Sequence, residues 1–167
     1  MLSLIAAVAE NNCIGLNGKM PWHISADLKY FKEKTKGKTL IMGANTYYSL
    51  GSPLKGREHI VLTREPAKHQ ERDNVAFTSE TDEIFAKYQA EPQEVFVIGG
   101  GEIYIKALPY CAKLYITEIY ESFPGDTFFP KIDANIFKKT DESEKYTDEN
   151  TGVSYRFTLY SRKNADN

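Results

Sequence analysis

Short apolar runs, each followed by a segment with helix boundary signals, constrain the fold of this chain more than any other feature. Five such runs have the length and composition of strands buried on both faces of a sheet, at residues 4–8, 39–42, 59–62, 94–98 and 113–119. Helices are predicted at 25–36, 45–50, 81–88 and 101–108, with Ser25 as an N-cap and Gly37, Gly51 and Pro109 as stops. Because strands that alternate with helices pair in parallel through crossovers, the sequence predicts an α/β fold.

The last third of the chain follows a different pattern. Residues 137–140 and 153–161 alternate apolar and polar side chains, which predicts an antiparallel ending at one edge of the sheet. The acidic stretch 141–150 between them is predicted to be a solvated loop. Neither repeats nor long linkers interrupt the chain, so residues 1–162 are expected to form one domain. A polar tail follows at 163–167, with fraying expected from Arg162 onward.

Charge and composition exclude several classes of function. The net charge is −2 with both signs interspersed, whereas nucleic acids and anionic membranes require a basic face. The apolar residues 2–9 lack the basic start of a secretory signal and are too short to span a bilayer, so a buried strand is expected.

Cys13 and Cys111 form no paired motif. A disulfide between them stays an open alternative, but a reduced cytoplasmic protein is favoured. The three histidines lack metal-ligand spacing, and no metal site is expected.

Three strand exits carry residues that suit phosphate groups. The glycine triplet 99–101 stands between a predicted strand and a predicted helix, as does Gly43, and a third exit supplies Thr63 and Arg64. Glycine lets backbone N–H groups approach a ligand, and a helix N-terminus favours an anion. A glycine triplet alone is more often a tight junction, and this one lacks the G-x-G-x-x-G spacing. Three such exits at the carboxyl ends of strands nevertheless indicate a dinucleotide.

The only tryptophan, Trp22, stands five residues before a carboxylate, Asp27, in a segment of apolar and small residues. Leu28 and Phe31 follow on the next helical turn, so desolvation should disturb the pKa of Asp27. Disturbed acids gather at functional sites, although an acid in a first helical turn more commonly faces solvent and complements the helix dipole. The apolar face around Asp27 favours the functional interpretation. The polar loop 10–20 before it is either a mobile lid or a surface connection.

Together these motifs resemble the dihydrofolate reductase family, in its bacterial chromosomal type. The resemblance runs from the first strand to the last, and the order and spacing of the motifs make it specific although each alone is weak. It rests on Leu4-Ile5-Ala6-Ala7, Ile14-Gly15, Met20-Pro21-Trp22, Ala26-Asp27-Leu28-x-x-Phe31, Met42-Gly43-x-x-Thr46, Pro53-Leu54 with Arg57, Ile98-Gly99-Gly100-Gly101-x-x-Tyr104, Thr117 and Gly125-Asp126-Thr127.

The resemblance implies a single-domain, eight-stranded, mostly parallel sheet with an antiparallel last strand and four flanking helices. It also implies hydride transfer from NADPH to carbon 6 of dihydrofolate, with protonation at nitrogen 5. Asp27 would hydrogen-bond the pterin, assisted by the Thr117 hydroxyl, and Trp22 would hold a water near the acid. The implied catalytic residues are Asp27, Trp22 and Tyr104. No sign of an obligate partner is present, so a monomer is expected.

The implied substrate-binding residues form an apolar cleft with a cationic end. Arg57 would grip the α-carboxylate of the glutamate tail with its guanidinium fork, and Lys32 would add charge there. The remaining members, besides Asp27 and Thr117, are Ile5, Ala7, Leu28, Phe31, Leu50, Leu54 and Ile98.

The implied cofactor-binding residues come from the loop and the strand exits. Those around the nicotinamide would be Ala7, Ile14, Gly15, Leu16, Asn17, Gly18, Lys19, Met20 and Tyr104, with Asp126 holding the loop by hydrogen bonds. The rest are Gly43, Ala44, Asn45, Thr46, Leu62, Thr63, Arg64, Ser79, Ile98, Gly99, Gly100, Gly101, Glu102, Ile103 and Thr127. The resemblance further implies a cis peptide between Gly99 and Gly100.

Three positions near the cofactor phosphates depart from the family pattern. Ala44 and Asn45 stand where the family often has Arg and His, and Glu102 stands where many members have Arg. Cationic side chains are therefore missing and an anion is added. Arg64 is expected to compensate at the ribose 2′-phosphate, and the margin of NADPH over NADH stays open. Smaller departures are Ser25 in place of proline and Ser52 in place of a basic residue.

Two alternatives stay open. The related reductase of riboflavin synthesis shares the fold but reduces a ribosyl-aminopyrimidine phosphate, and it would require neither the pairing of Trp22 with Asp27 nor Arg57. A nucleotide-binding protein without catalysis would use the glycine junctions alone.

Overall fold

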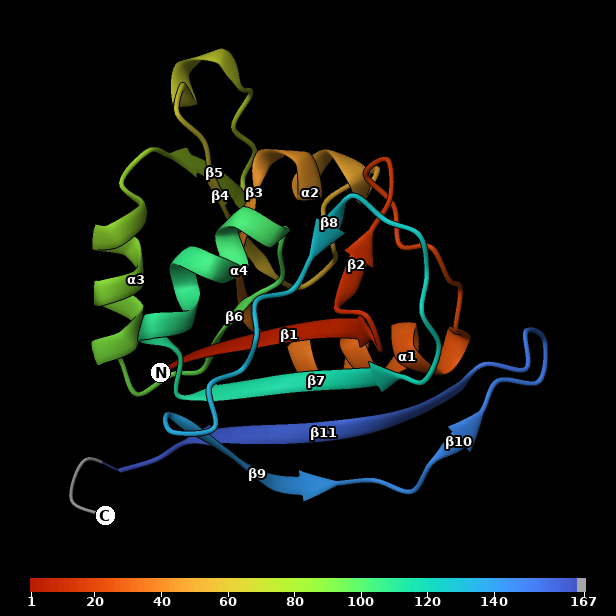
Figure 1. Ribbon diagram of the computed structural model, residues 1–167. Helices are drawn as coiled ribbons and strands as arrows, with labels where there is room; N and C mark the ends of the chain where they lie inside the picture. Colours follow the sequence, from red (N-terminus) through yellow and green to blue (C-terminus); the bar gives the residue numbers. More distant parts are fainter. Residues whose placement is uncertain (165–167) are drawn as a thin grey trace.

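The computed structural model describes residues 1–164, which are arranged around one large central sheet (Figure 1). Its strands are β1 (Leu2–Ala9), β3 (Thr39–Gly43), β4 (Glu58–Leu62), β5 (Val75–Thr78), β6 (Val95–Val97), β7 (Lys113–Ile119), β9 (Phe137–Glu142), β10 (Tyr146–Thr147) and β11 (Ser154–Arg162). A small second sheet pairs β2 (Cys13–Gly15) with β8 (Thr127–Phe128). The helices are α1 (Ser25–Thr35), α2 (Ala44–Ser49), α3 (Thr81–Ala90) and α4 (Gly101–Ala107), with 3₁₀ turns η1 (Pro66–Lys68) and η2 (Leu108–Tyr110).

The large sheet has the order β10-β11-β7-β1-β6-β3-β4-β5. Strands β9 and β10 pair with the same edge of β11: β10 pairs with its first residues and β9 pairs with its last residues. The sheet is therefore eight positions wide. Pairs from β7 to β5 are parallel, and β11 is antiparallel to β7. The predicted α/β sheet with an antiparallel ending and four helices is confirmed. Because the parallel strands share a direction, the carboxyl ends of β1, β3, β4 and β6 meet at one edge, where ligands bind in such folds.

Consecutive residues of the central strands pack into two separate hydrophobic cores. Leu4 belongs to a cluster with Phe85 of α3 and residues of α4, whereas Ile5 belongs to a cluster with Tyr47 of α2 and residues of α1. Successive side chains of a strand point to opposite faces, so α3 and α4 cover one face of the sheet and α1 and α2 cover the other. Burial on both faces explains why these strands are continuous apolar runs in the sequence.

Three predictions about local structure were wrong. Ser25 is the first residue of α1 and caps nothing, because the N-cap position belongs to Ile24 and has no side-chain hydrogen bond. The acidic stretch is not a plain loop: β9 continues to Glu142, and β10 lies inside it. β5 was not predicted at all, although Val75 and Phe77 are buried in the alternating pattern of a half-buried edge strand.

The end of the chain is better ordered than expected up to Asn164. Arg162 closes β11, and its guanidinium donates to the carbonyl oxygens of Cys111 (2.8 Å) and Leu108 (3.0 Å), so the expected fraying at this residue was wrong. The rest of the predicted tail, residues 165–167, lies outside the described residues. None of the helices in residues 1–164 combines the length and apolar character needed to cross a bilayer.

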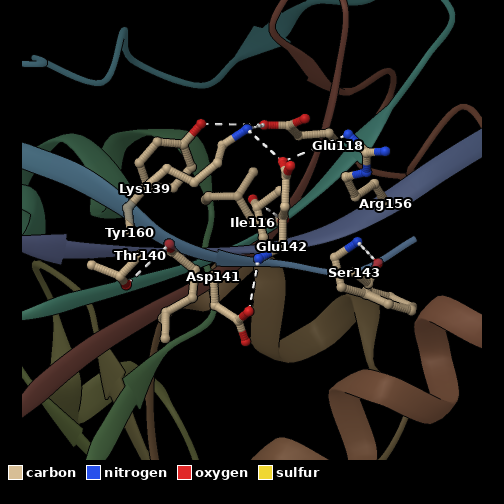
Figure 2. Close-up of polar contacts among 12 residues, drawn as sticks. Ile116, Glu118, Lys139, Thr140, Asp141, Glu142, Ser143, Arg156 and Tyr160 are labelled. Atoms are coloured by element: carbon tan, nitrogen blue, oxygen red, sulfur yellow. Dashed lines mark hydrogen bonds and ion pairs between the residues drawn. The ribbon is translucent and has the colours of Figure 1, made fainter. Parts of the chain in front are cut away.

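A polar cluster ties β9 to the neighbouring strands of the C-terminal edge (Figure 2). Glu118 of β7 lies 3.1 Å from the Lys139 ammonium of β9 and accepts a 3.2 Å hydrogen bond from the Tyr160 hydroxyl of β11. Burial alone would raise the pKa of Glu118, but these bonds and one from Tyr120 hold it below its usual range. Since Thr117 and Glu118 point to opposite faces of β7, this cluster supports the strand on the face away from Thr117.

Candidate active site

Asp27 and Thr117 meet across the face of the sheet that α1 covers. The Thr117 hydroxyl donates a 2.6 Å hydrogen bond to Asp27 Oδ1, although the two residues are 90 positions apart. Asp27 stands in the first turn of α1, where its N–H donates to the Ile24 carbonyl, and buried Thr117 lies on β7 directly beside Ala7 of β1. Desolvation raises the pKa of Asp27, and the Thr117 hydrogen bond opposes part of that rise.

Two aromatic pairs pack near the start of α1 and beside Thr117. Trp22 is buried with its ring 5.2 Å from that of Phe123, and its Nε1 is enclosed without a hydrogen-bond acceptor among the described residues. Tyr30 stacks on Phe157 at 4.1 Å, and Phe157 is the strand neighbour of Thr117. Burial and the Asp27 charge raise the pKa of Tyr30 to about 12. Sequence reasoning missed Tyr30, although its position three residues after Asp27 puts both on one helix face.

The predicted apolar walls are brought together on the same face of the sheet. One cluster contains the predicted Ile5, Phe31, Leu50, Leu54 and Ile98. Ala7 packs in the neighbouring cluster that contains Trp22, while Leu28 is more exposed, at 37%. The walls and the acid therefore lie on one side of the sheet, between α1 and the carboxyl ends of β1 and β6.

A cationic hollow of about 560 Å³ lies along the outer side of α1. It contains the predicted Leu28, Lys32 and Arg57, and it adds cations that sequence reasoning missed, at Lys29, Lys36 and Lys55, with Glu33 as its one acid. Spacings of three and four residues between Lys29, Lys32 and Lys36 were a visible signal for one helix face. A chain of net charge −2 therefore concentrates cations where the acidic tail of a substrate was expected.

Arg57 is held in place at the rim of this hollow. Its Nε donates to the Thr35 hydroxyl at 3.2 Å, and its two terminal nitrogens donate to the carbonyl oxygens of Lys55 (2.8 Å) and Lys32 (3.0 Å). Each terminal nitrogen keeps a second N–H. The fork is thus oriented by the protein while it retains donors for an anion.

The strand exits at β3 and β6 form one tightly packed glycine junction. The Gly43 N–H donates to the Gly99 carbonyl at 2.9 Å, and the peptide between Gly99 and Gly100 is cis, as expected. A Cβ on Gly100 would lie 3.3 Å from the Thr46 hydroxyl, and one on Gly101 would lie 2.7 Å from Thr127 Cγ2. A side chain at position 101 would therefore collide with Thr127, and one at position 100 would need the Thr46 hydroxyl to shift.

The Tyr104 hydroxyl connects this junction to β1. It lies 2.8 Å from the carbonyl oxygens of both Ile5 and Ile98, so it joins the carboxyl ends of β1 and β6. The ring is buried against Phe129. Tyr104 was predicted as catalytic, and the structure places it as a backbone-linking side chain at the centre of the site.

The loop before α1 is anchored to the segment around β8. The Asn17 N–H donates to Asp126 Oδ2 at 3.0 Å, which confirms the expected hydrogen bond between Asp126 and the loop. The Asp126 N–H in turn donates to the Gly15 carbonyl at 3.0 Å. Ile14 packs against the core, whereas Leu16, Gly18, Lys19 and Met20 are exposed. The loop therefore has one fixed strand, β2, and one solvent-facing tip.

The phosphate end of the predicted site is open and carries mixed charge. Arg64 follows β4 and is exposed, and Glu102 in α4 pairs with Lys106 at 3.1 Å. Lys106, with a smaller contribution from the field of Arg64, holds the pKa of Glu102 below its usual range. Ala44 and Asn45 begin α2 without adding charge. The remaining predicted residues also lie at strand exits or helix starts: Leu62 ends β4, Thr63 follows it, Ser79 follows β5, and Ile103 lies in α4.

Comparisons with known proteins agree over the whole of this architecture. The family model for dihydrofolate reductase matches residues 1–162. A dihydrofolate reductase of Neisseria meningitidis is 41% identical over 165 residues, which cover 96% of this chain and 98% of the relative. One of Bacillus subtilis is 36% identical over 165 residues, which cover 99% of this chain and 96% of the relative. A solved dihydrofolate reductase from Enterococcus faecalis, complexed with NADP(H) and RAB-propyl, superposes with a TM-score of 0.87 at 36% identity, covering 98% of this chain and 97% of that one.

Proposed function

The chain belongs to the dihydrofolate reductase family, and from that membership we propose the reaction it catalyses. It reduces 7,8-dihydrofolate to tetrahydrofolate for one-carbon metabolism, with a hydride to carbon 6 and a proton to nitrogen 5, and it uses NADPH. The observation that carries the proposal is the hydrogen bond between Thr117 and Asp27, because it places one acid of raised pKa in an apolar cleft. One such acid suits a reaction that needs one proton.

Asp27 holds the pterin in this proposal. Its carboxylate accepts hydrogen bonds from the pterin amino group and ring nitrogen, while the Thr117 hydroxyl fixes Oδ1 and leaves Oδ2 for the substrate. Because desolvation raises its pKa, a larger fraction of Asp27 carries a proton near neutral pH than for an exposed acid. The enclosed Trp22 N–H, without a protein acceptor in the described chain, is suited to hold a water beside this acid.

The arrangement of glycines fits a dinucleotide. Close packing at Gly43, Gly99 and Gly100 leaves backbone without side chains at the β3 and β6 exits, and α2 and α4 begin there. The dinucleotide complex of the Enterococcus faecalis protein supports the same use here. NADPH supplies the hydride when bound, and the protein positions the two rings and excludes water from between them. The loop 10–20 covers the nicotinamide, and Arg64 meets the 2′-phosphate.

The tail of the substrate enters the cationic hollow. The guanidinium fork of Arg57 binds the α-carboxylate of the glutamate through its remaining donors, and Lys32 adds charge beside it. We further propose that the protein acts as a monomer in the cytoplasm, in keeping with the free thiols of Cys13 and Cys111.

A spectrophotometric assay tests this function directly. Loss of the NADPH absorbance band on addition of dihydrofolate is the expected result, and correctly folded protein without turnover would contradict the proposal. The same assay with the aminopyrimidine precursor of riboflavin gives no turnover if the proposal holds. Asp27→Asn is the matched variant, because the amide keeps the shape of the side chain but has no ionisable proton to donate.

A further inference from the structure

His59 is buried in β4, and both nitrogens of its ring are bonded to the main chain. The Leu54 N–H lies 3.0 Å from Nε2, and the Asn74 carbonyl oxygen lies 3.2 Å from Nδ1. An amide N–H only donates and a carbonyl only accepts. The ring is therefore the neutral tautomer with its proton on Nδ1, because no other form satisfies both partners.

The segment held by this ring carries two of the proposed substrate-binding residues. Leu54 supplies an apolar wall and Arg57 supplies the guanidinium, and between them the chain turns through Gly56 at a φ of +70°. Among the described residues, no main-chain N–H from 52 to 56 other than that of Leu54 donates a hydrogen bond. At the other end, the Asn74 amide donates to the Arg57 carbonyl at 3.3 Å. His59 and Asn74 thus hold the two ends of the turn.

We propose that neutral His59 is a positioning residue for the substrate tail. By accepting a hydrogen bond from the Leu54 N–H, His59 fixes the positions of Leu54 and Arg57. The inference rests on the proposed function and adds a residue that contacts no part of the substrate. Protonation of the ring would break this contact. A proton on Nε2 would face the Leu54 N–H, so two hydrogen-bond donors would oppose each other and the ring would release the Leu54 end of the turn.

The surroundings of the ring favour the neutral form. Burial is the main effect and lowers the pKa of His59, and the Arg57 charge lowers it further. Hydrogen bonds to the Asn74 and Arg57 carbonyls and the charge of Glu58 raise the pKa, but the net shift is downward. The Tyr47 ring of α2 faces it edge-on at 6.4 Å. The holding contact is therefore complete at neutral pH and is lost as pH falls below the ordinary range of histidine.

A selectivity ratio tests this role without interference from Asp27. We would measure kcat/KM for dihydrofolate and for 6-methyl-7,8-dihydropterin, which lacks the tail, and divide the first by the second. Asp27 acts on both substrates, so its titration cancels. His59→Phe keeps an aromatic ring but removes the acceptor, and it should lower the ratio roughly tenfold, the equivalent of one lost hydrogen bond. His59→Gln offers an acceptor that does not titrate and should restore most of the ratio.

Two further arms sharpen the test. Between pH 7 and pH 5, the ratio of the unchanged protein should fall, whereas that of His59→Gln should stay flat. In an Arg57→Ala background, His59→Phe should lower the ratio less than it does in the unchanged protein, because the part of its effect that acts through Arg57 is already lost and only the part through Leu54 remains. His69→Gln is the control, since the partners of His69 are Tyr48 and Thr63 at the phosphate end, and its ratio should match the unchanged protein.

Each outcome separates this inference from the proposed function. If the unchanged protein reduces dihydrofolate but the ratio is the same in His59→Phe and flat with pH, His59 only stabilises the fold and the inference is wrong. If the unchanged protein reduces neither substrate, the proposed function fails instead. Should His59→Phe not fold, as judged by a thermal melt, the pH series of the unchanged protein and of His59→Gln decides the question.

Discussion

The proposed pterin end and the proposed phosphate end of the site are built in different ways. At the proposed pterin end, Asp27 of α1 and Thr117 of β7 are joined by a 2.6 Å hydrogen bond, so both partners belong to regular elements, and Trp22 just before α1 is buried. At the proposed phosphate end, Arg64 and Glu102 are exposed, and the ion pairs formed there, Glu102 with Lys106 and Glu65 with Lys68, are open to solvent. One end is held by a buried hydrogen bond before any ligand arrives, and the other presents solvent-exposed charges.

This difference predicts how each end responds to change. Interactions among desolvated groups are strong and insensitive to salt, whereas exposed charges contribute little and are screened. Substitutions at the proposed pterin end should therefore change turnover tenfold or more, and those at the proposed phosphate end should change cofactor affinity several-fold. The four predictions below test that contrast.

Asp27→Asn should produce the largest effect. The variant cannot donate or store the one proton the reaction needs, so kcat near neutral pH should fall by roughly 10²–10⁴, the usual contribution of a positioned acid. The dissociation constant of NADPH, measured by fluorescence titration, should barely change. The rate should also lose the decline that we expect for the unchanged protein as pH rises through the raised pKa of Asp27. Turnover within a few-fold of the unchanged protein would remove Asp27 from the mechanism.

Thr117→Val should have the next largest effect, with a diagnostic pH shift. Valine has nearly the shape of threonine but cannot donate to Asp27, and that hydrogen bond lowers the pKa of the acid. Its loss should raise the pKa further and move the alkaline decline of kcat/KM to higher pH. The maximal rate should fall about tenfold, as expected for a lost hydrogen bond to a charged group. Thr117→Ser, which keeps the hydroxyl, should retain the original profile.

The sequence predicted the pterin end more completely than the remainder of the site, for a physical reason. Buried strands and a desolvated acid impose residue types that can be read one at a time, so the α/β sheet and Asp27 were foreseen. The short strands β2 and β8 were missed because they follow from pairing between distant segments, which local composition does not encode. The two-residue strand β10 pairs with the nearby start of β11 and was hidden in an acidic stretch that looked like a solvated loop. Lys29, Lys36 and Lys55 were missed for a related reason: exposed lysines are ordinary until a fold places them around one hollow.

Arg64→Ala should weaken NADPH binding about fivefold and leave NADH unaffected. An exposed guanidinium that meets one phosphate is worth about 1 kcal/mol at low salt, and NADH lacks that phosphate. The difference between the cofactors should narrow as salt is raised, because exposed charges are screened. Arg64→Lys should keep most of the affinity. Equal losses for NADPH and NADH would show that the 2′-phosphate is bound elsewhere.

Glu102→Gln should have the smallest effect, and its sign is opposite to that of Arg64→Ala. In the proposed site the carboxylate would repel the cofactor phosphates, and it pairs with Lys106, which lies 3.1 Å away. Its removal frees a cation in α4, so NADPH should bind roughly twofold more tightly at low salt, with no gain at high salt. Glu83→Gln, an equal charge change in the first turn of α3, should leave the affinity unchanged. If Glu102→Gln instead changed turnover while affinity stayed constant, the contrast between a chemical end and an affinity end would not hold.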